Sequence, residues 1–197
     1  MRIIAGTARH RIIKPVPDQL TRPTTDRIKE SIFNILQFQI ADKRILDIFS
    51  GTGNMALESL SRGARNAVYI DQRKISIETI QENIRSLGFE KQSRVIFSTA
   101  LKAIETLGNE KATFDIIFCD PPYNKGFEIP TMELLAATNL LDPEGILIVR
   151  HQQNTVLPET VATFHLARQK KYGDCRVSFY SLKSPDSDSN TEETLCP

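Results

Sequence analysis

A carboxylate, two prolines and an aromatic ring follow one another at Asp120-Pro121-Pro122-Tyr123, directly after the apolar run 114–119. The run is typical of a buried strand, and two consecutive prolines cannot continue its ladder, so the chain leaves the sheet as a stiff loop. The Asp120 carboxylate and the Pro121 carbonyl can both accept hydrogen bonds from one amino group, while the Tyr123 ring can lie flat against a planar base. The loop therefore predicts a site for the exocyclic amine of a nucleobase; a proline-stiffened turn is the alternative.

A glycine-rich turn lies upstream, between the apolar run 45–49 and the helical pattern 54–62. Gly51 and Gly53 allow a tight turn and the close approach of the backbone to a ligand. Asp71 ends a second apolar run, twenty residues after Gly51, and a carboxylate at this place suits the two hydroxyls of a ribose. The strand, the glycine turn, the helix and the acid together predict a nucleotide-like ligand.

Two ligands fit this turn. Read as Gly51-x-Gly53-x-x-Ala56, it matches a dinucleotide fingerprint, with a pyrophosphate at the helix N-terminus. Asp47, just before the turn, favours S-adenosylmethionine, because a carboxylate repels a pyrophosphate but attracts the amino group or sulfonium of the methionine part. The loop at Asp120 favours the same ligand, since hydride transfer has no need of it.

The pairing of Asp47-x-x-x-Gly51-x-Gly53 with the Asp-Pro-Pro-Tyr loop resembles the amino-directed S-adenosylmethionine-dependent methyltransferases. The two ends of the chain narrow the resemblance. Its start, MRIIAGTARHR and then LTRPTTDRIKESIFN from residue 20, is similar to that of the bacterial 16S ribosomal RNA guanine-N2 methyltransferases. Its end, KYGD at 171–174 and VSFY at 177–180, is also like theirs, so the resemblance runs from residue 1 to about residue 183.

This resemblance implies a role for each residue of the loop. Asp120 and Pro121 would orient the target amine, Pro122 would shape the loop, and Tyr123 would stack on a base rotated out of its helix or loop. Whether Asp120 or water takes the departing proton stays open.

The resemblance also implies a cofactor site made of Asp47, Ser50, Gly51, Gly53, Asn54, Asp71, Gln72, Thr99, Ala100, Arg22 and Thr24. Many relatives have an acid where Thr99 stands, and a threonine can accept the hydrogen bond of the adenine amino group only without charge. Arg9, Arg11 and Lys14 are the candidates for contacts with RNA phosphates.

Apolar runs at 45–49, 67–70, 94–97, 114–119 and 145–149 alternate with amphipathic stretches at 54–62, 73–87, 100–107 and 129–140. This alternation predicts an α/β fold with a parallel sheet and right-handed crossovers. The stretches 163–167 and 176–182, joined around residues 172 and 173, predict an antiparallel hairpin at the sheet edge. A mostly parallel sheet with such a hairpin is the Rossmann-like class I methyltransferase fold that the resemblance implies.

Three regions are expected along the chain: a basic N-terminal hairpin extension at 1–23, a methyltransferase domain at 24–183 and a disordered acidic tail at 184–197. Thr24 or Thr25 caps a helix predicted from about residue 26 to 39, with an apolar stripe along one side.

The net charge of +1 conceals an uneven distribution. Residues 1–30 hold seven basic against three acidic side chains, and residues 165–183 hold five against one. Basic segments on both sides of a base-binding loop favour a polyanionic partner. The resemblance specifies this partner as small-subunit ribosomal RNA in an assembled or late-assembling subunit.

Three scattered cysteines, at 119, 175 and 196, indicate a reducing compartment and no structural zinc. No signal peptide or membrane-length apolar run is present in the sequence, so we expect a cytoplasmic monomer without a metal. Adenine-N6 or protein glutamine-amide methylation remain open as targets, as does a non-catalytic ribosome-assembly factor on the same fold. An aspartate at position 120 disfavours the glutamine class.

Overall fold

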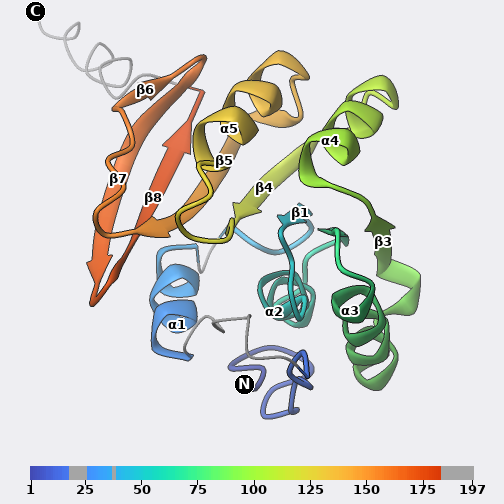
Figure 1. Ribbon diagram of the computed structural model, residues 1–197. Coiled ribbons are helices and arrows are strands. Elements are labelled where there is room, and N and C mark those ends of the chain that lie inside the picture. The colour runs from blue at the N-terminus through green and yellow to red at the C-terminus, as the bar shows by residue number, and fades with distance from the viewer. Residues whose placement is uncertain (18–25, 37–38, 183–197) are drawn as a thin grey trace, which may run out of the picture.

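The computed structural model describes residues 1–17, 26–36 and 39–182 of the chain. Within them, eight strands form one sheet in the order β3-β2-β1-β4-β5-β8-β7-β6 (Figure 1). The parallel part consists of β1 (Arg44–Ile48), β2 (Asn66–Asp71), β3 (Ser93–Phe97), β4 (Phe114–Cys119) and β5 (Leu141–Gln152). The antiparallel part consists of β8 (Cys175–Ser181), β7 (Phe164–Tyr172) and β6 (Thr160–Val161).

Helices cover both faces of the sheet (Figure 1). One face carries α1 (Asp26–Ile35), α2 (Asn54–Ser61) and α3 (Lys74–Leu87), whose buried side chains share one core cluster. The other face carries α4 (Ala100–Asn109) and α5 (Glu128–Ala137), which pack in a second cluster. A short 3-10 turn, Glu90–Gln92, precedes β3. The predicted mostly parallel sheet with an antiparallel edge hairpin is therefore confirmed.

Several boundaries differ from the sequence prediction. Helix α1 ends at Ile35; Leu36, which extended the apolar pattern, is also buried but does not belong to the helix. Strand β5 continues to Gln152, since its last six residues pair with β8 on the other side. Strand β7 is also longer than expected and reaches Tyr172 through polar residues that pair with β8.

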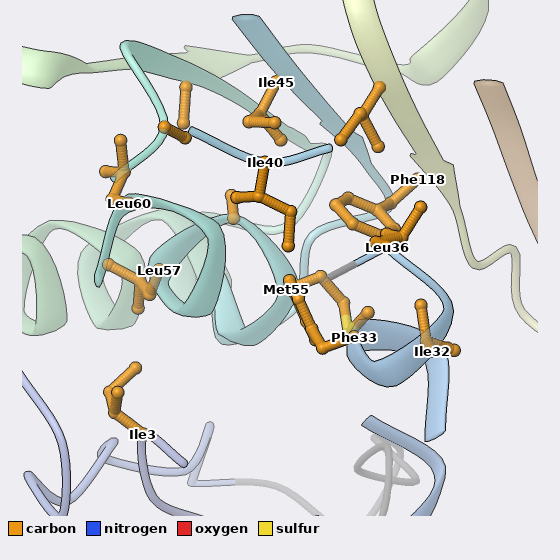
Figure 2. Close-up of a cluster of buried hydrophobic side chains, with 14 of the residues drawn as sticks. Ile3, Ile32, Phe33, Leu36, Ile40, Ile45, Met55, Leu57, Leu60 and Phe118 are labelled. Atoms are coloured by element: carbon orange, nitrogen blue, oxygen red, sulfur yellow. The ribbon is translucent and has the colours of Figure 1, made fainter. Parts of the chain in front are cut away.

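The core on the face of α1 and α2 draws side chains from the N-terminal segment, both helices, β1 and β4. Figure 2 shows this packing, with Phe33 and Phe118 at a ring-centroid distance of 6.0 Å. The residues labelled there are Ile3, Ile32, Phe33, Leu36, Ile40, Ile45, Met55, Leu57, Leu60 and Phe118. The N-terminal segment thus shares its core with the rest of the molecule.

A buried ion pair joins α1 to α2. Lys29 and Glu58 are both 0% exposed, and the Lys29 Nζ lies 3.0 Å from Oε2 of Glu58. The Lys29 ammonium also donates to the carbonyl of Arg2 at 2.5 Å, while Glu58 accepts the backbone N–H groups of Ile4 at 2.8 Å and Ala5 at 3.0 Å. Burial lowers the pKa of Lys29, although Glu58 opposes this shift.

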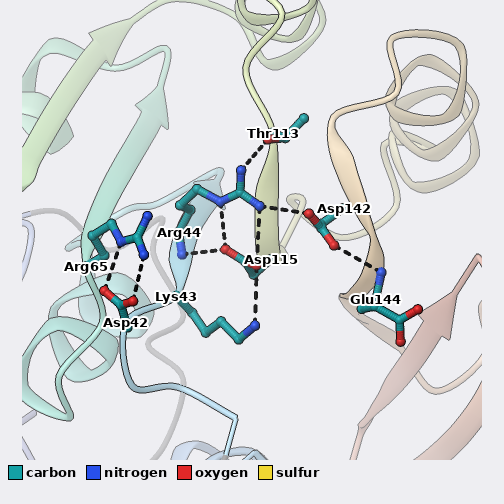
Figure 3. A network of polar contacts seen from close by, with 8 residues as sticks. All are labelled: Asp42, Lys43, Arg44, Arg65, Thr113, Asp115, Asp142 and Glu144. Atoms are coloured by element: carbon teal, nitrogen blue, oxygen red, sulfur yellow. Dashed lines mark hydrogen bonds and ion pairs between the residues drawn. The ribbon is translucent and has the colours of Figure 1, made fainter.

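A second charge network closes the amino ends of the central strands (Figure 3). Arg44 on β1 donates to Asp115 on β4 at 2.8 Å and to Asp142 on β5 at 2.9 Å, and Lys43 lies 3.4 Å from Asp115. Burial alone would raise the pKa of Asp115, but the hydrogen bonds from Arg44 lower it to about 2. The network therefore stabilises the sheet while Asp115 is ionised.

The N-terminal segment folds back on itself, as predicted, but with little regular pairing. Arg2 and Ile12 form an isolated antiparallel bridge, and Ile3 exchanges backbone hydrogen bonds with His10 and Arg11. Residues 18–25 lie outside the described residues, as do the predicted boundary between 23 and 24 and the tail 184–197.

Cys119 and Cys175 are free and buried, and Cys196 lies outside the described residues. None of the helices in the described ranges has the length and apolar character needed to cross a membrane.

Gly6 fixes how the N-terminal segment sits on α2. Its φ is +82°, and a Cβ at this position would lie 1.7 Å from the carbonyl oxygen of Ser61, which accepts the backbone N–H of Thr7 at 2.8 Å. We therefore expect Gly6→Ala to lower the free energy of unfolding by about 3 kcal/mol or more, measured by urea denaturation.

Gly88→Ala is the matched control. Gly88 has a similar φ of +78°, but an added Cβ would meet nothing within 4 Å. It should cost about 1 kcal/mol, from backbone strain alone. Equal losses for the two variants would show that the contact between Gly6 and Ser61 contributes nothing.

Candidate active site

A cavity of about 700 Å³ opens at the carboxyl ends of the parallel strands. It lies where the strand order reverses, with β2 on one side of β1 and β4 on the other. The loops after β1 and β4 leave for opposite faces of the sheet, so they part and leave room for a ligand between them. The volume suits a small organic molecule.

The loop after β1 is a tight turn. Phe49, Gly51 and Gly53 have φ values of 61°, 58° and 77°, and α2 begins directly afterwards. Gly53 packs away from the cavity: a Cβ there would lie 3.0 Å from the ring of Tyr69. Ser50 fixes the turn to both strands, since its hydroxyl donates to the Asp47 carbonyl at 2.5 Å and accepts the Ile70 N–H at 3.0 Å.

Asp71 holds the same loop from β2. One carboxylate oxygen accepts the N–H of Gly51 at 2.9 Å and the other accepts the N–H of Arg73 at 2.9 Å. The Arg73 guanidinium lies 3.8 Å away. The side chain therefore forms the cavity wall and fixes the shape of the glycine turn.

Asp47 is the most deeply placed carboxylate of the site. It is 3% exposed, and Oδ2 accepts the N–H of Ala56 at 3.3 Å. Burial raises the pKa of Asp47 well above its ordinary value, and the nearby carboxylates of Asp120 and Asp71 raise it further. A bound cation would favour the charged form, so this position suits an ammonium or sulfonium group.

Asn54, the first residue of α2, also lines the cavity and is 5% exposed. Its Oδ1 accepts a hydrogen bond from the Lys29 ammonium at 2.8 Å, which fixes the orientation of the amide because an ammonium can only donate. Among the described residues, Nδ2 has no hydrogen-bond partner. A buried donor of this kind suits an acceptor group of a ligand.

The loop after β4 brings its polar groups to the same cavity. Asp120 accepts a hydrogen bond from Nε of Arg150 at 2.7 Å, and its own N–H donates to the carbonyl of Ile48 at 3.3 Å. The Arg150 guanidinium carbon lies 5.8 Å from the centre of the Tyr123 ring. Burial raises the pKa of Tyr123 to about 12, so its hydroxyl stays protonated.

Most of the residues predicted from the sequence line the cavity. These are Asp47, Ser50, Gly51, Asn54, Asp71, Gln72, Ala100, Asp120, Pro121, Pro122 and Tyr123. Gly53 and Thr99 are not among the lining residues, although Ser98 and Ala100 on either side of Thr99 are. Arg22 and Thr24 lie outside the described residues.

The three basic candidates lie away from the cavity. Arg9 is exposed, Arg11 donates to the carbonyl of Ser86, and the Lys14 ammonium lies 2.7 Å from Glu82 on α3. Their contact with RNA stays a prediction. Among the described residues, no group of three or more His, Cys, Asp or Glu side chains is arranged to hold a metal ion.

Part of the cavity wall was not predicted from the sequence. Arg150 follows the apolar run of β5, and Met1 and Val16 come from the N-terminal segment. A signal for Arg150 existed: it is the first polar residue after that run, as Asp120 is after the run of β4. Since Cys119 pairs with Val149, the two polar side chains leave neighbouring strands side by side.

Comparison with known proteins gives a consistent result. The family model described as "Conserved hypothetical protein 95" matches residues 1–181. YlbH of Bacillus subtilis is 33% identical over 93% of this chain and 100% of its own length. Escherichia coli "Ribosomal RNA small subunit methyltransferase D" is also 33% identical, over 93% of this chain and 91% of its own.

A solved structure, that of yhhF from Escherichia coli, superposes with a TM-score of 0.81 at 33% identity and covers 93% of this chain and 98% of that one. The Rossmann-like class I methyltransferase fold expected from the sequence is confirmed.

The raised pKa of Asp47 predicts how the stability of the protein depends on pH. Because its pKa is raised in the folded state, the folded protein binds this proton more tightly than the unfolded chain, and stability is lost as pH rises through the raised value. Asp47→Asn should therefore raise the free energy of unfolding of the ligand-free protein at pH 8 by more than about 1 kcal/mol.

Asp115→Asn is the matched control, with the opposite sign. The lowered pKa of Asp115 contributes stability that is present above its ordinary value and lost as pH falls towards 2. This variant should be less stable than the parent at pH 8. Urea unfolding of both variants at pH 5 and pH 8 measures the effect, and a loss of stability in both would contradict the assignment for Asp47.

Proposed function

We propose that this chain, which belongs to the family described as "Conserved hypothetical protein 95", is an S-adenosylmethionine-dependent methyltransferase that methylates N2 of a guanine in small-subunit ribosomal RNA. The name of its Escherichia coli relative supports methylation of small-subunit ribosomal RNA, and the choice of guanine N2 is our proposal. One observation carries it: the buried carboxylate of Asp47 and the Asp120 loop meet in one cavity at the switch point of the sheet. The first suits a cationic methyl donor and the second suits an amine that accepts the methyl group.

Two groups of the cavity match the proposed donor: the buried carboxylate of Asp47 and the side-chain amide nitrogen of Asn54. S-adenosylmethionine supplies a methyl group made electrophilic by a sulfonium. Asp47 stabilises the positive charge of the methionine part, and Nδ2 of Asn54 donates to its carboxylate. Asp71 and Gln72 bind the ribose hydroxyls, and Ser98 and Ala100 border the adenine.

The residues of the Asp120 loop act on the acceptor. An exocyclic guanine amine is a poor nucleophile because its lone pair is delocalised into the ring. The Asp120 carboxylate and the Pro121 carbonyl accept its two N–H bonds, localise the lone pair and aim it at the donor. Tyr123, which is half-buried at the cavity rim, stacks on the base with about 1–3 kcal/mol, which offsets part of the cost of unstacking it.

The RNA partner is supported by the distribution of charge. Basic side chains gather in residues 1–30 and along β7 and β8, on either side of the Asp120 loop in the sequence. Such side chains bind phosphates and position the RNA, while the loop selects the base. We place the reaction in the cytoplasm, on an assembled or late-assembling small subunit, with the chain acting as a monomer.

Methyl transfer tests this function directly. Small ribosomal subunits lacking the modification, naked 16S RNA and duplex DNA are incubated with methyl-labelled cofactor, and nucleoside digests are read by mass spectrometry. We expect N2-methylguanosine from the subunits, reduced about 100-fold or more in Asp120→Asn, because a neutral amide oxygen is a weaker acceptor than a carboxylate and does not stabilise the positive charge that develops on the amine.

Cofactor affinity is the control, since Asp120→Asn should bind S-adenosylmethionine as the parent does. N6-methyladenosine in the digest would keep the mechanism and refute the target. Absence of any methylated nucleoside, with cofactor binding intact, would point to a protein amide. Absence of cofactor binding with retained RNA binding would point to an assembly factor.

The charge of Asp47 predicts how cofactor affinity depends on pH. The ionised carboxylate is needed to stabilise the cationic ligand, and the raised pKa of Asp47 means that a proton must leave on binding. The Kd for S-adenosylmethionine, measured by calorimetry, should rise by up to about tenfold per pH unit as pH falls below that pKa.

Adenosine is the matched ligand, because it lacks the methionine part. Its affinity should vary little with pH, and Asp47→Asn should bind S-adenosylmethionine weakly at every pH. The same pH dependence for both ligands would refute this role of Asp47.

A further inference from the structure

Arg150 contacts both parts of the catalytic loop. Its Nε donates to Oδ1 of Asp120 at 2.7 Å, and its guanidinium lies 5.8 Å from the centre of the Tyr123 ring. The side chain is 12% exposed and that of Asp120 is 24% exposed, so the ion pair is largely removed from water. Arg150 also lines the cavity itself.

The two partners differ in how firmly they are held. Arg150 lies in β5, which pairs with β4 on one side and β8 on the other, opposite Val177. Asp120 and Tyr123 lie in the loop that follows β4. A carboxylate on a loop can rotate about its side-chain bonds, and a charged hydrogen bond from a rigid strand restricts that rotation.

Charge gives a second reason for a cation here. Three carboxylates, Asp47, Asp71 and Asp120, line one cavity, and the nearness of the other two disfavours ionised Asp47. Arg150 compensates the charge of Asp120, and the amine needs Asp120 as an acceptor. An ionised carboxylate in one fixed orientation is what the proposed reaction requires of this residue.

We propose that Arg150 is a positioning residue for the methyl-acceptor site, which fixes the Asp120 carboxylate and the Tyr123 ring in the relative orientation that receives the target base. The inference rests on the proposed methyl transfer. Arg150 touches neither the donor nor the migrating methyl group in this assignment, and it acts through Asp120. Its guanidinium donates to the Asp120 carboxylate and lies over the Tyr123 ring at the same time, which a lysine ammonium cannot do equally well.

The test compares Arg150→Met, Arg150→Lys and the parent at saturating cofactor and acceptor. We expect kcat to fall by about 10- to 100-fold in Arg150→Met, because a displaced acceptor group loses the aligned geometry. Arg150→Lys should lie between Arg150→Met and the parent. The Kd for S-adenosylmethionine should stay within about twofold in both variants, since Asp47 and the glycine turn are unchanged.

Arg94→Met is the matched control. Arg94, like Arg150, is paired with a carboxylate: it donates to Glu110 at 2.6 Å and 2.8 Å, but on the exposed surface and outside the cavity. Its kcat should equal that of the parent. Arg150→Ala provides a further readout: guanidinium chloride at tens of millimolar should restore part of kcat, and sodium chloride at the same concentration should not.

The outcomes separate this inference from the function on which it rests. If the parent methylates no acceptor, the proposed function fails. If the parent is active, an unchanged kcat in Arg150→Met overturns the positioning role, as does a raised KM for RNA alone, which would make Arg150 an RNA contact. If Arg150→Met does not fold, Arg150→Lys decides: a parental kcat, or a loss explained entirely by a lower melting temperature, overturns the inference.

Discussion

The buried pair of Lys29 and Glu58 determines how the N-terminal half of the molecule fits together. Removing either partner would leave a buried charge uncompensated, at a cost of about 3–5 kcal/mol. Glu58 accepts two N–H groups of the N-terminal segment, and Lys29 reaches Asn54 at the start of α2. One pair therefore connects α1, α2 and the N-terminal segment, which allows Met1 and Val16 to complete the cavity wall.

The sheet topology determines where the residues of the candidate site lie. Because β1 connects towards β2 and β4 connects towards β5, the loops after β1 and β4 border one opening at the switch point. Asp47 lies on β1, and Asp120 lies in the loop after β4. The two residues are 73 positions apart in the sequence, yet they are close enough in space that the charge of Asp120 raises the pKa of Asp47. The proposed donor and acceptor sites are adjacent for this topological reason.

The sequence was sufficient for features that depend on local pattern. The five parallel strands, the edge hairpin and most of the cavity wall could be predicted, because apolar runs and turn residues mark where each strand ends. Features that depend on pairing between distant segments could not. The polar end of β5 continues as a strand because β8 pairs with it, and the sequence pattern of β5 alone does not show this. Gly53 does not line the cavity; it leaves room for the ring of Tyr69, and its position in the motif does not reveal this.

The charged groups at the amino ends of the strands stabilise the fold, whereas those at the carboxyl ends line the candidate active site. At the amino ends, Arg44 satisfies both Asp115 and Asp142, and the lowered pKa of Asp115 records a net gain for the folded state. At the carboxyl ends, none of the described residues places such a cation beside the buried carboxylate of Asp47, and its raised pKa corresponds to a loss of stability of the folded state. In the proposed function a positively charged donor would offset this loss, so the proposed affinity for a cationic donor and the lower stability of the ligand-free protein would have the same physical origin. Arg150 forms an ion pair with Asp120, whereas Asp47 would be paired by the proposed cationic donor, and this difference in charge compensation distinguishes the proposed acceptor side of the cavity from the proposed donor side.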